Sequence, residues 1–248
     1  MGYLRTAWLL GRNLTLRSAR NPVTTGLFVL LPVALLALFG GVTRSAGDHA
    51  AFNGLFAIFT GIALMMLGVV GLATMLPMDK KLGVLRRLEA TPFRASQLML
   101  GCTISSLALG VVSIAIMVGV SLVFFHFNVQ GSYLDLMVFI LLGLLMSVSI
   151  GLAIGGWAKD DTAATFVSQI VFLGSLAVSG VWFPRVALPG WLHAVSNFAP
   201  LTPIIDGVKD IATQGKGLFD LGPQLGVMAI WVVVAYLVGS KLFRWESN

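Results

Sequence analysis

The stretch LMVFILLGLLMSVSIGLAIGGWA occupies residues 136–158 and contains no Asp, Glu, Lys, Arg or His. A bilayer core of about 30 Å needs about 20 apolar residues of helix, so this stretch is long enough to cross a membrane. Five further stretches share both properties, and the six predicted spans are 22–43, 52–78, 95–125, 136–158, 162–183 and 221–240. The strands of a membrane barrel would be about ten residues long with alternating polarity. We therefore expect an all-α integral membrane protein.

The composition of the whole chain agrees with this class. Of its 248 residues, 57% are hydrophobic and 10% are charged, whereas an average soluble domain has about 25% charged residues. A disordered chain would need low hydrophobicity, and a disulfide framework would need more than the single Cys102. A nucleic-acid binder would need contiguous basic surface, which the scattered Lys and Arg do not form. These three classes are excluded.

The distribution of Lys and Arg predicts the orientation of the spans. Residues 1–20, 79–94 and 241–248, together with Lys159, contain 12 of the 16 Lys and Arg. Because positive residues are enriched in cytoplasmic loops, we expect both termini in the cytoplasm. A cleaved signal peptide is the less favoured alternative, since about 20 residues with four Arg precede the first span.

Residues 1–20 are predicted to form a helix at the membrane surface. Leu4, Trp8, Gly11 and Leu14 fall on one helical face, and Arg side chains on the other faces can reach anionic headgroups. The Pro at position 22 then begins the first span. The pattern leaves open whether this helix is a simple anchor or takes part in gating.

Residues 79–94 are predicted to contain a short amphipathic helix between the second and third spans. Leu82, Leu85 and Leu88 form an apolar ridge, and the basic residues Lys80, Lys81, Arg86 and Arg87 occupy the other faces. From composition alone, such a helix either rests on lipid headgroups or docks a cytoplasmic partner. Both interpretations stay open at this point.

A stripe of small residues marks the fourth span. Ser147, Gly151 and Gly155 recur every four residues, which lets another helix approach closely. Packing inside the subunit and dimerisation explain this spacing equally well.

The segment 184–220 is the longest connection, and we expect it on the outer side. Four prolines divide it into short pieces, while Trp191, Leu192, Val195 and Phe198 share an apolar face. A freely solvated loop would not keep such a face. We therefore expect helices that dip into the outer leaflet, where each helix satisfies its own backbone hydrogen bonds.

The motifs of several chemistries are missing from the sequence. No G-x-x-x-x-G-K-[ST] loop occurs, because Asp210 stands where the first Gly of that motif would precede Gly215-Lys216. The three His residues are isolated from one another, and neither HExxH nor CxxC is present, so no metal site is expected. The predicted spans also carry no ionisable residue of the kind that ion-coupled transporters use. An enzyme is disfavoured, and energy for any transport is expected to enter from outside the membrane.

Two segments resemble one known family. DKKLGVLRRLEATP, residues 79–92, resembles the coupling helix between the second and third spans of ABC type-2 exporter permeases. SGVWFP at 179–184, followed by Leu188-Pro189, Trp191-Leu192, Pro200-Leu201-Thr202 and Ile205-Asp206-Gly207, is similar to the extracellular hairpin of the same family. The chain departs from the family pattern where Lys80 and Lys81 stand between Asp79 and the loop Gly83.

The resemblance implies a single transmembrane domain over residues 1–248. It would have an interfacial helix at 1–20, the six transmembrane helices, a coupling helix in 79–94 and a re-entrant helical hairpin in 184–220. It assigns contact with the partner to Asp79, Lys80, Lys81, Leu82, Gly83, Leu85, Arg86, Arg87 and Leu88. It assigns an extracellular gate to Phe183, Pro184, Pro189, Trp191, Leu192, Phe198 and Pro200. A substrate path through the first, second and fifth spans would be lined by Phe28, Phe39, Phe56, Phe59, Met65, Met66, Phe166 and Phe172.

The resemblance also implies partners and a function. We expect two copies of a separate ABC ATP-binding subunit that holds ATP and Mg, a second permease copy that is identical or related, and membrane lipid around them. No cofactor, metal or nucleic acid is expected on this chain. The complex would export an apolar or amphipathic substrate, such as a drug or lipid, across an inner or plasma membrane. A self-contained secondary transporter or channel is the main alternative, and a membrane scaffold or immunity protein is a third.

Overall fold

The computed structural model describes residues 3–19, 22–45, 49–81, 95–182, 185 and 188–242, and no strand occurs among them. Their elements, in chain order, are α1 (Tyr3–Ala19), α2 (Pro22–Ser45), α3 (His49–Met65), the π-helix η1 (Met66–Gly71), α4 (Leu72–Lys81), α6 (Ala95–Phe125), α7 (Tyr133–Trp157), α8 (Asp161–Val178), α9 (Gly190–Phe198), α10 (Leu201–Gln214), the 3₁₀-helix η3 (Leu218–Leu221) and α11 (Gly222–Leu242).

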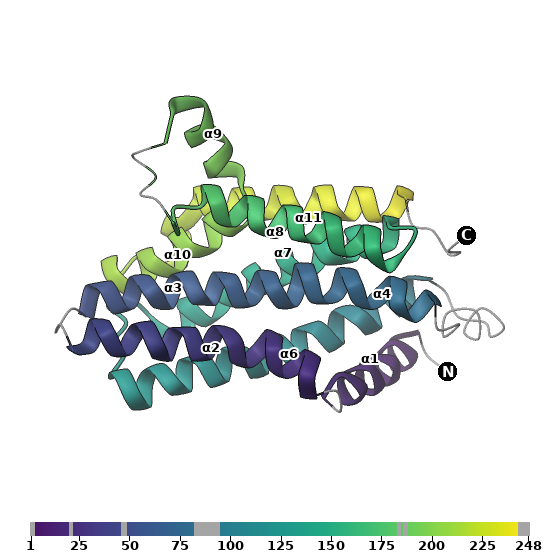
Figure 1. Ribbon diagram of the computed structural model, residues 1–248, viewed down its shortest axis with the longest axis horizontal. Helices are drawn as coiled ribbons and strands as arrows, with labels where there is room; N and C mark the ends of the chain where they lie inside the picture. The colour runs from purple at the N-terminus through teal and green to yellow at the C-terminus, as the bar shows by residue number, and fades with distance from the viewer. Residues whose placement is uncertain are drawn as a thin grey trace.

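Six segments of the described chain are long and apolar enough to cross a membrane: Gly26–Thr43, Ala51–Met78, Leu100–Phe125, Tyr133–Trp157, Asp161–Val178 and Leu218–Gly239. They lie side by side along the long axis of the molecule (Figure 1). The prediction of an all-α membrane protein with six spans is confirmed. The second span is continuous through α3, η1 and α4, whereas α8 ends at Val178, shortly before Gly180 with its positive φ of 87°.

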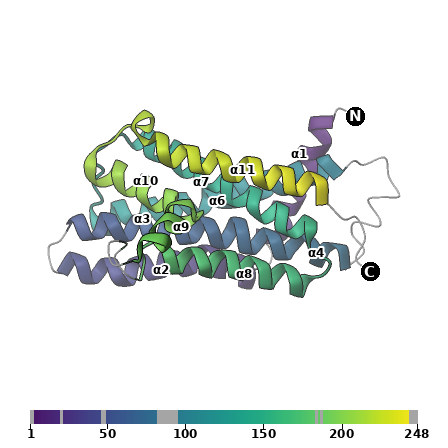
Figure 2. The same cartoon turned by 90° about the horizontal axis from the view of Figure 1, so that it is seen from above.

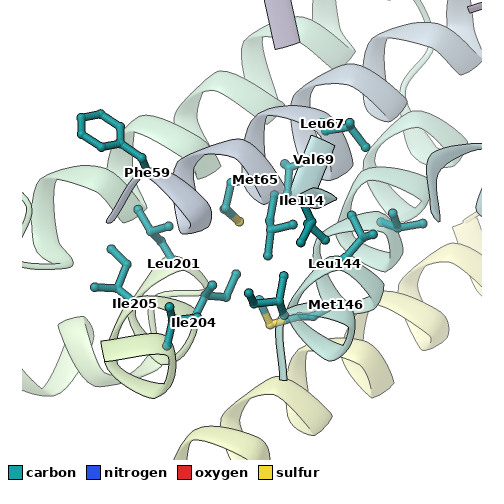
Figure 3. Close-up of a cluster of buried hydrophobic side chains, with 14 of the residues drawn as sticks. Phe59, Met65, Leu67, Val69, Ile114, Leu144, Met146, Leu201, Ile204 and Ile205 are labelled. Carbon is teal, nitrogen blue, oxygen red and sulfur yellow. The ribbon is translucent and has the colours of Figure 1, made fainter. Parts of the chain in front are cut away.

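The second and fourth spans form the centre of the bundle. In these two spans, 72% and 61% of the residues are buried, compared with 17% to 28% in the other four. Side chains from η1, α6, α7 and α10 meet there, among them Val69, Ile114, Leu144 and Ile204 (Figure 3). Because lipid tails are as apolar as these side chains, close packing rather than removal from water holds the spans together.

The small residues of α7 pack inside this chain. A Cβ atom added to Gly68 of η1 would lie 2.6 Å from the Cβ of Ser147, and one added to Gly155 would lie 3.0 Å from the carbonyl oxygen of Ala73 in α4. Of the two explanations for the stripe of Ser147, Gly151 and Gly155, packing within the subunit is therefore the one that the structure supports.

Helix α1 packs against the first half of α6 through a small residue. A Cβ atom at Gly11 would lie 2.8 Å from Cγ2 of Ile104, so Gly11 allows the two helices to approach closely. Trp8, Leu9 and Leu16 of α1 remain exposed. The beginning of α1 and the end of α11 lie at the same end of the bundle (Figures 1 and 2). The position of α1 relative to a membrane surface stays a prediction.

Candidate functional site

The predicted coupling segment begins where α4 ends. Asp79, Lys80 and Lys81 are the last residues of α4, and this helix packs against α7 and α8. The other predicted contact residues lie outside the described residues, and they are Leu82, Gly83, Leu85, Arg86, Arg87 and Leu88. Because α4 continues directly from η1 and α3, the start of the segment is attached to the buried centre of the bundle.

Two short helices, α9 and α10, lie at the opposite end of the bundle from α1 (Figure 1). Pro189 precedes α9, and Pro200 precedes α10. Proline is favoured at the start of a helix because its fixed φ suits the helix and its missing N–H is not needed there. Gly215 ends α10 with a φ of 67°, the left-handed conformation that favours glycine. Of the predicted gate residues, Phe183 and Pro184 lie outside the described residues.

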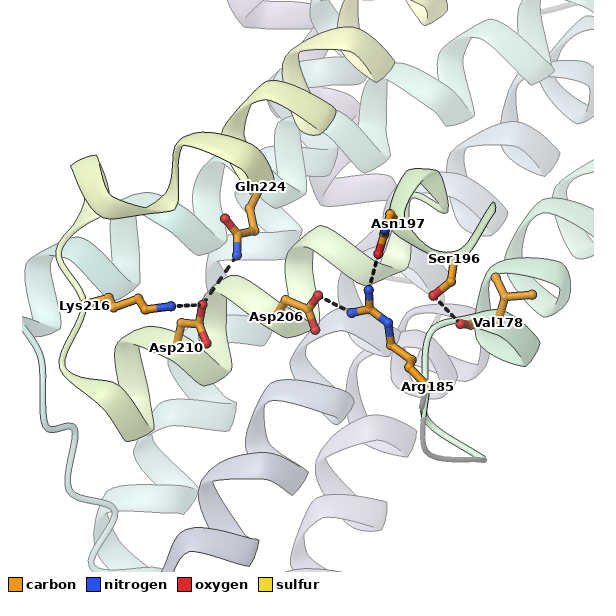
Figure 4. Close-up of polar contacts among 8 residues, drawn as sticks. All are labelled: Val178, Arg185, Ser196, Asn197, Asp206, Asp210, Lys216 and Gln224. Carbon is orange, nitrogen blue, oxygen red and sulfur yellow. Dashed lines mark hydrogen bonds and ion pairs between the residues drawn. The ribbon is translucent and has the colours of Figure 1, made fainter. Parts of the chain in front are cut away.

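One arginine joins the parts of this hairpin (Figure 4). The Arg185 guanidinium donates hydrogen bonds to the carboxylate of Asp206 in α10 and to the side-chain oxygen of Asn197 in α9. In addition, the Ser196 hydroxyl donates to the carbonyl oxygen of Val178 at the end of α8, over 2.7 Å. Arg185 thus connects α9 to α10, and Ser196 connects α9 to the end of the fifth span.

A second polar cluster connects α10 to α11. Lys216 Nζ lies 2.9 Å from Oδ2 of Asp210, and Gln224 Nε2 donates to the same oxygen over 3.4 Å (Figure 4). The backbone N–H of Gly217 donates to Asp220 Oδ2 over 3.0 Å. These contacts fix the turn between the hairpin and the sixth span.

Helix α9 is held against α11 by one hydrogen bond beside an apolar groove. Trp231 Nε1 donates to the carbonyl oxygen of Phe198 over 2.7 Å. A shallow groove of about 430 Å³ lies between the two helices, lined by Ala194, Val195, Phe198, Ala199 and Trp231. Trp191, Val195 and Phe198 are exposed, whereas Leu192 is half-buried and Pro200 is buried. The apolar side of α9 therefore has no cover within the described chain.

A clasp joins three segments at this end of the bundle. The buried Asn53 of α3 donates from Nδ2 to the carbonyl oxygens of Ala212, at 3.1 Å, and Asn128, at 3.5 Å. The backbone N–H groups of Gln130 and Gly131 donate to Ala212 and Ile211. The connection between α6 and α7 is thereby fixed to the end of α10.

The eight predicted path residues fall into two groups. Phe56, Phe59, Met65 and Phe172 are buried in the core of this chain. Phe39 and Phe166 are exposed, and Phe28 and Met66 are half-buried. The rings of Phe39 and Phe59 stack with their centroids 5.9 Å apart, which connects α2 to α3. Whether any of the eight contacts a substrate stays a prediction.

Among the described residues, no group of three or more His, Cys, Asp or Glu is placed to hold a metal ion. The sequence analysis did not single out three side chains that the structure places in notable positions. Asn53 and Trp231 bond to the backbone of distant segments, and Gln169 lies in the middle of α8. Asn53 and Gln169 are uncharged, so a pattern of ionisable residues does not indicate them. The contact of Trp231 joins positions far apart in the chain, so no local pattern indicates it.

Comparison with known proteins agrees with this architecture. The chain is 24% identical over 223 residues to the daunorubicin resistance ABC transporter permease protein DrrB1 of Streptomyces coeruleorubidus, which covers 87% of this chain and 78% of the relative. It is 27% identical over 140 residues, 56% of its length, to ABC transporter G family member 20 of Dictyostelium discoideum, and 28% identical over 100 residues, 40% of its length, to Nodulation protein J of Rhizobium leguminosarum bv. viciae. The matched regions make up only 19% and 38% of these last two relatives.

The family model of the ABC-2 type transporter matches residues 5–212. This match extends from α1 to the end of α10, so it includes both the segment after α4 and the hairpin. The chain is therefore a member of the ABC-2 type transporter family.

Proposed function

We propose that this chain is the membrane subunit of an ATP-driven exporter that moves apolar or amphipathic molecules out of the cell. The observation that carries the proposal is the family match over residues 5–212, on a chain with six apolar candidate spans. We place it in an inner or plasma membrane with both termini in the cytoplasm, as the distribution of Lys and Arg indicates.

ATP hydrolysis is assigned to a separate ATP-binding subunit, two copies of which would serve two permease copies. Two observations support this assignment. The sequence contains no G-x-x-x-x-G-K-[ST] loop, and the relative that aligns over 78% of its own length is named a permease protein. Mg and ATP would be bound by that partner.

The coupling segment, residues 79–94, is the proposed contact with the ATPase. Lys80, Arg86 and Arg87 would meet acidic surface on the partner, while Leu82, Leu85 and Leu88 would fill an apolar groove. Movement of this segment would act first on α4, whose helix continues into η1 and α3 at the centre of the bundle. The arrangement gives the ATPase a mechanical connection to the second span.

The first, second and fifth spans are the proposed contact with a second permease copy and the path of the substrate. α2, α3 and α8 lie on one face of the bundle (Figure 1). Large apolar side chains of α2 and α8 are exposed, including Leu31, Phe39 and Phe166. An apolar or amphipathic substrate fits such a lining. The name of DrrB1, a daunorubicin resistance permease, supports a drug-like substrate.

The hairpin of α9 and α10 is the proposed outer gate. Its helices lie at the far end of the bundle from α4, and the exposed Trp191 and Phe198 offer apolar surface where a substrate would leave (Figure 1). Arg185, through Asp206 and Asn197, would hold the hairpin as one unit during opening.

The test is purification of the tagged chain from its host in mild detergent, followed by assay for a bound, vanadate-sensitive ATPase. A triple variant with Gly83, Leu85 and Leu88 each changed to Asp should lose the ATPase and ATP-dependent transport while it still inserts. Phe219→Asp is a matched control, because it places a charge on a side chain that is 98% exposed in η3. Transport in liposomes by the chain alone would overturn the proposal in favour of a channel or ion-coupled transporter.

A further inference from the structure

Gln169 lies in the middle of a candidate membrane span. It is the ninth of the 18 residues of α8, Asp161–Val178. With a rise of 1.5 Å per residue, its Cα is about 12 Å from either end of the helix. The side chain is partly exposed, so it is not enclosed by the core of this chain.

The amide of Gln169 makes no hydrogen bond to any part of the chain that the structure describes. An amide can donate two hydrogen bonds and accept two. In hydrocarbon, a polar group without a partner costs several kcal/mol, so such groups are normally satisfied within the protein. A partner from outside the described chain is therefore required.

Several other polar side chains in the candidate spans differ from Gln169. On α8, the hydroxyls of Thr165, Ser168 and Ser175 donate to carbonyl oxygens of their own helix. Nearer the ends of the second and sixth spans, the side-chain nitrogens of Asn53 and Gln224 each donate a hydrogen bond, while Oε1 of Gln224 accepts none in the described chain. Among the amide side chains of the candidate spans in the described ranges, Gln169 is thus the one that makes no hydrogen bond.

The surroundings of Gln169 decide among three possible partners. On one side, Ser168 and Phe172 are buried; on the other, Phe166, Ile170 and Leu173 are exposed. A lipid tail offers no hydrogen bond. A second copy that packs on α8 would contact the three exposed apolar side chains. Gln169 would then lie at the edge of that contact, because it is on the side of α8 nearest to α4 and η1. What remains is a space between subunits that holds water or a polar group.

A second property of α8 supports a polar setting. Among the six candidate spans in the described ranges, α8 has the lowest mean hydropathy. Thr162 and Thr165 lie on the same flank as Gln169, at helical spacings of three and four residues. This flank is the least suited to contact with lipid tails.

We propose that Gln169 lines a water-accessible substrate path and that its amide hydrogen-bonds the polar group of an amphipathic substrate. The proposal rests on the exporter function above and adds a requirement to it. The substrate class is an apolar body that carries at least one hydrogen-bonding group, and Gln169 discriminates it from a purely apolar molecule of similar size and charge.

The first test measures access of water to this position, without any substrate. In a Cys102→Ala background, which removes the single cysteine, Gln169→Cys is compared with Ile170→Cys and Leu173→Cys. A charged, membrane-impermeant methanethiosulfonate reagent should modify the cysteine at 169 at least tenfold faster than those at 170 and 173. Equal rates at the three positions would overturn the proposal. A disulfide between two copies through the cysteine at 169 would also overturn it, because the second copy would then be the partner.

The second test compares two lipophilic cations, ethidium, which carries two amino groups, and tetraphenylphosphonium, which has no hydrogen-bonding group. With the ATPase bound, Gln169→Leu should lower ethidium export about fivefold, the value of one neutral hydrogen bond, and leave tetraphenylphosphonium export unchanged. Gln169→Asn should restore part of the loss. An equal loss for both cations would show a merely structural role and overturn the proposal.

The two tests separate failure of this inference from failure of the exporter function. If the intact complex moves neither cation with ATP, the proposed drug-like substrate fails, while the cysteine reaction still decides whether Gln169 faces water. If ATP-driven export is found and the cysteine at 169 is unreactive, the exporter function stands and the inference about Gln169 is wrong.

Discussion

Gly151 of α7 lies directly on the backbone of Gly68 in η1: a Cβ atom at Gly151 would be 2.0 Å from the carbonyl oxygen of Gly68. The contact occurs where the second span leaves α-helical geometry for one π-helical segment, Met66–Gly71. Such segments are rare and are frequently found at functional sites. Because the contact is between two backbones, no side-chain rotation can relieve the clash that an added atom would cause.

The first prediction concerns this contact. Gly151→Ala should destabilise the protein, because the new methyl group meets a carbonyl oxygen that cannot move away independently of η1. Overpacking typically costs about 1–3 kcal/mol, and a clash with backbone belongs at the upper end. Gly174→Ala on α8 is the control, since a Cβ atom added there would have no neighbouring atom within 4 Å. Thermal unfolding in detergent should show a midpoint several degrees lower for Gly151→Ala alone, and equal midpoints would contradict the prediction.

Much of the fold could be predicted because charged residues cannot enter the bilayer core at low cost. Asp79 to Lys81 and Lys159 to Asp161 end the uncharged stretches, and α4, α7 and α8 begin or end near them. The side-chain oxygen of Asp160 accepts a hydrogen bond from the N–H of Ala163 and caps α8, so an acidic residue of the charged connection also starts the fifth span.

The π-helical segment could not be predicted from the sequence. Met66–Gly71 is apolar throughout and fits an α-helical pattern as well as any other part of the span. Its contacts with Ser147 and Gly151 come from a helix about 80 residues later in the chain, as the 82-residue separation of the Met65 and Ser147 contact illustrates. The sequence indicated a close helix contact through the small residues of α7 but left the partner open.

Likewise, the setting of the hairpin depends on contacts between distant residues. The apolar face of α9 is visible in the sequence as Trp191, Val195 and Phe198. The bond of Trp231 to the backbone of Phe198 joins residues 33 positions apart and has no local signal. Gln169 was missed for a different reason: its amide is uncharged, and only the arrangement of the helices shows that it has no hydrogen-bond partner within the described chain.

The second prediction tests the attachment of α9 to the sixth span. Trp231→Phe keeps an aromatic ring in the groove but removes the donor to the Phe198 carbonyl oxygen. Loss of a neutral hydrogen bond typically costs about 0.5–1.5 kcal/mol, so the thermal midpoint should fall by a few degrees and amide exchange in α9 should accelerate. Trp191→Phe is the matched control, because that side chain is 72% exposed. Identical exchange of α9 in the two variants would disprove the role of the bond.

The third prediction concerns the clasp around Asn53. Asn53→Leu keeps a similar volume but removes the donor to the carbonyl oxygens of Ala212 and Asn128. We expect a loss of about 1–3 kcal/mol of folding free energy and faster proteolysis in the connection between α6 and α7. Asn13→Leu on the exposed side of α1 applies the same substitution and should change neither quantity. Resistance to proteolysis equal to that of the unmodified chain would show that the clasp is dispensable.

The fourth prediction tests whether Arg185 unites the hairpin. Asp206→Arg removes the acceptor in α10 and places two positive charges together, so protease added on the side of the membrane that carries the hairpin should cut between α8 and α9 several times faster. The double variant Arg185→Asp with Asp206→Arg restores an opposite pair and should recover part of the resistance. The side chains of Arg185 and Asp206 are 23% and 34% exposed, and exposed pairs contribute at most about 1 kcal/mol. Recovery should therefore be incomplete, also because an aspartate at 185 cannot reproduce the second hydrogen bond of Arg185, to Asn197.

Salt separates the charge effect from the effect of the Asn197 bond. Screening weakens interactions between charges much more than a bond to a neutral amide. High salt should therefore reduce the difference between Asp206→Arg and the unmodified chain, whereas the sensitivity of Asn197→Ala should hardly change. If the double variant recovered nothing at any ionic strength, the pair of Arg185 and Asp206 would have no part in holding α9 to α10. The bond from Ser196 to Val178, which joins α9 to the fifth span, would be unaffected by that result.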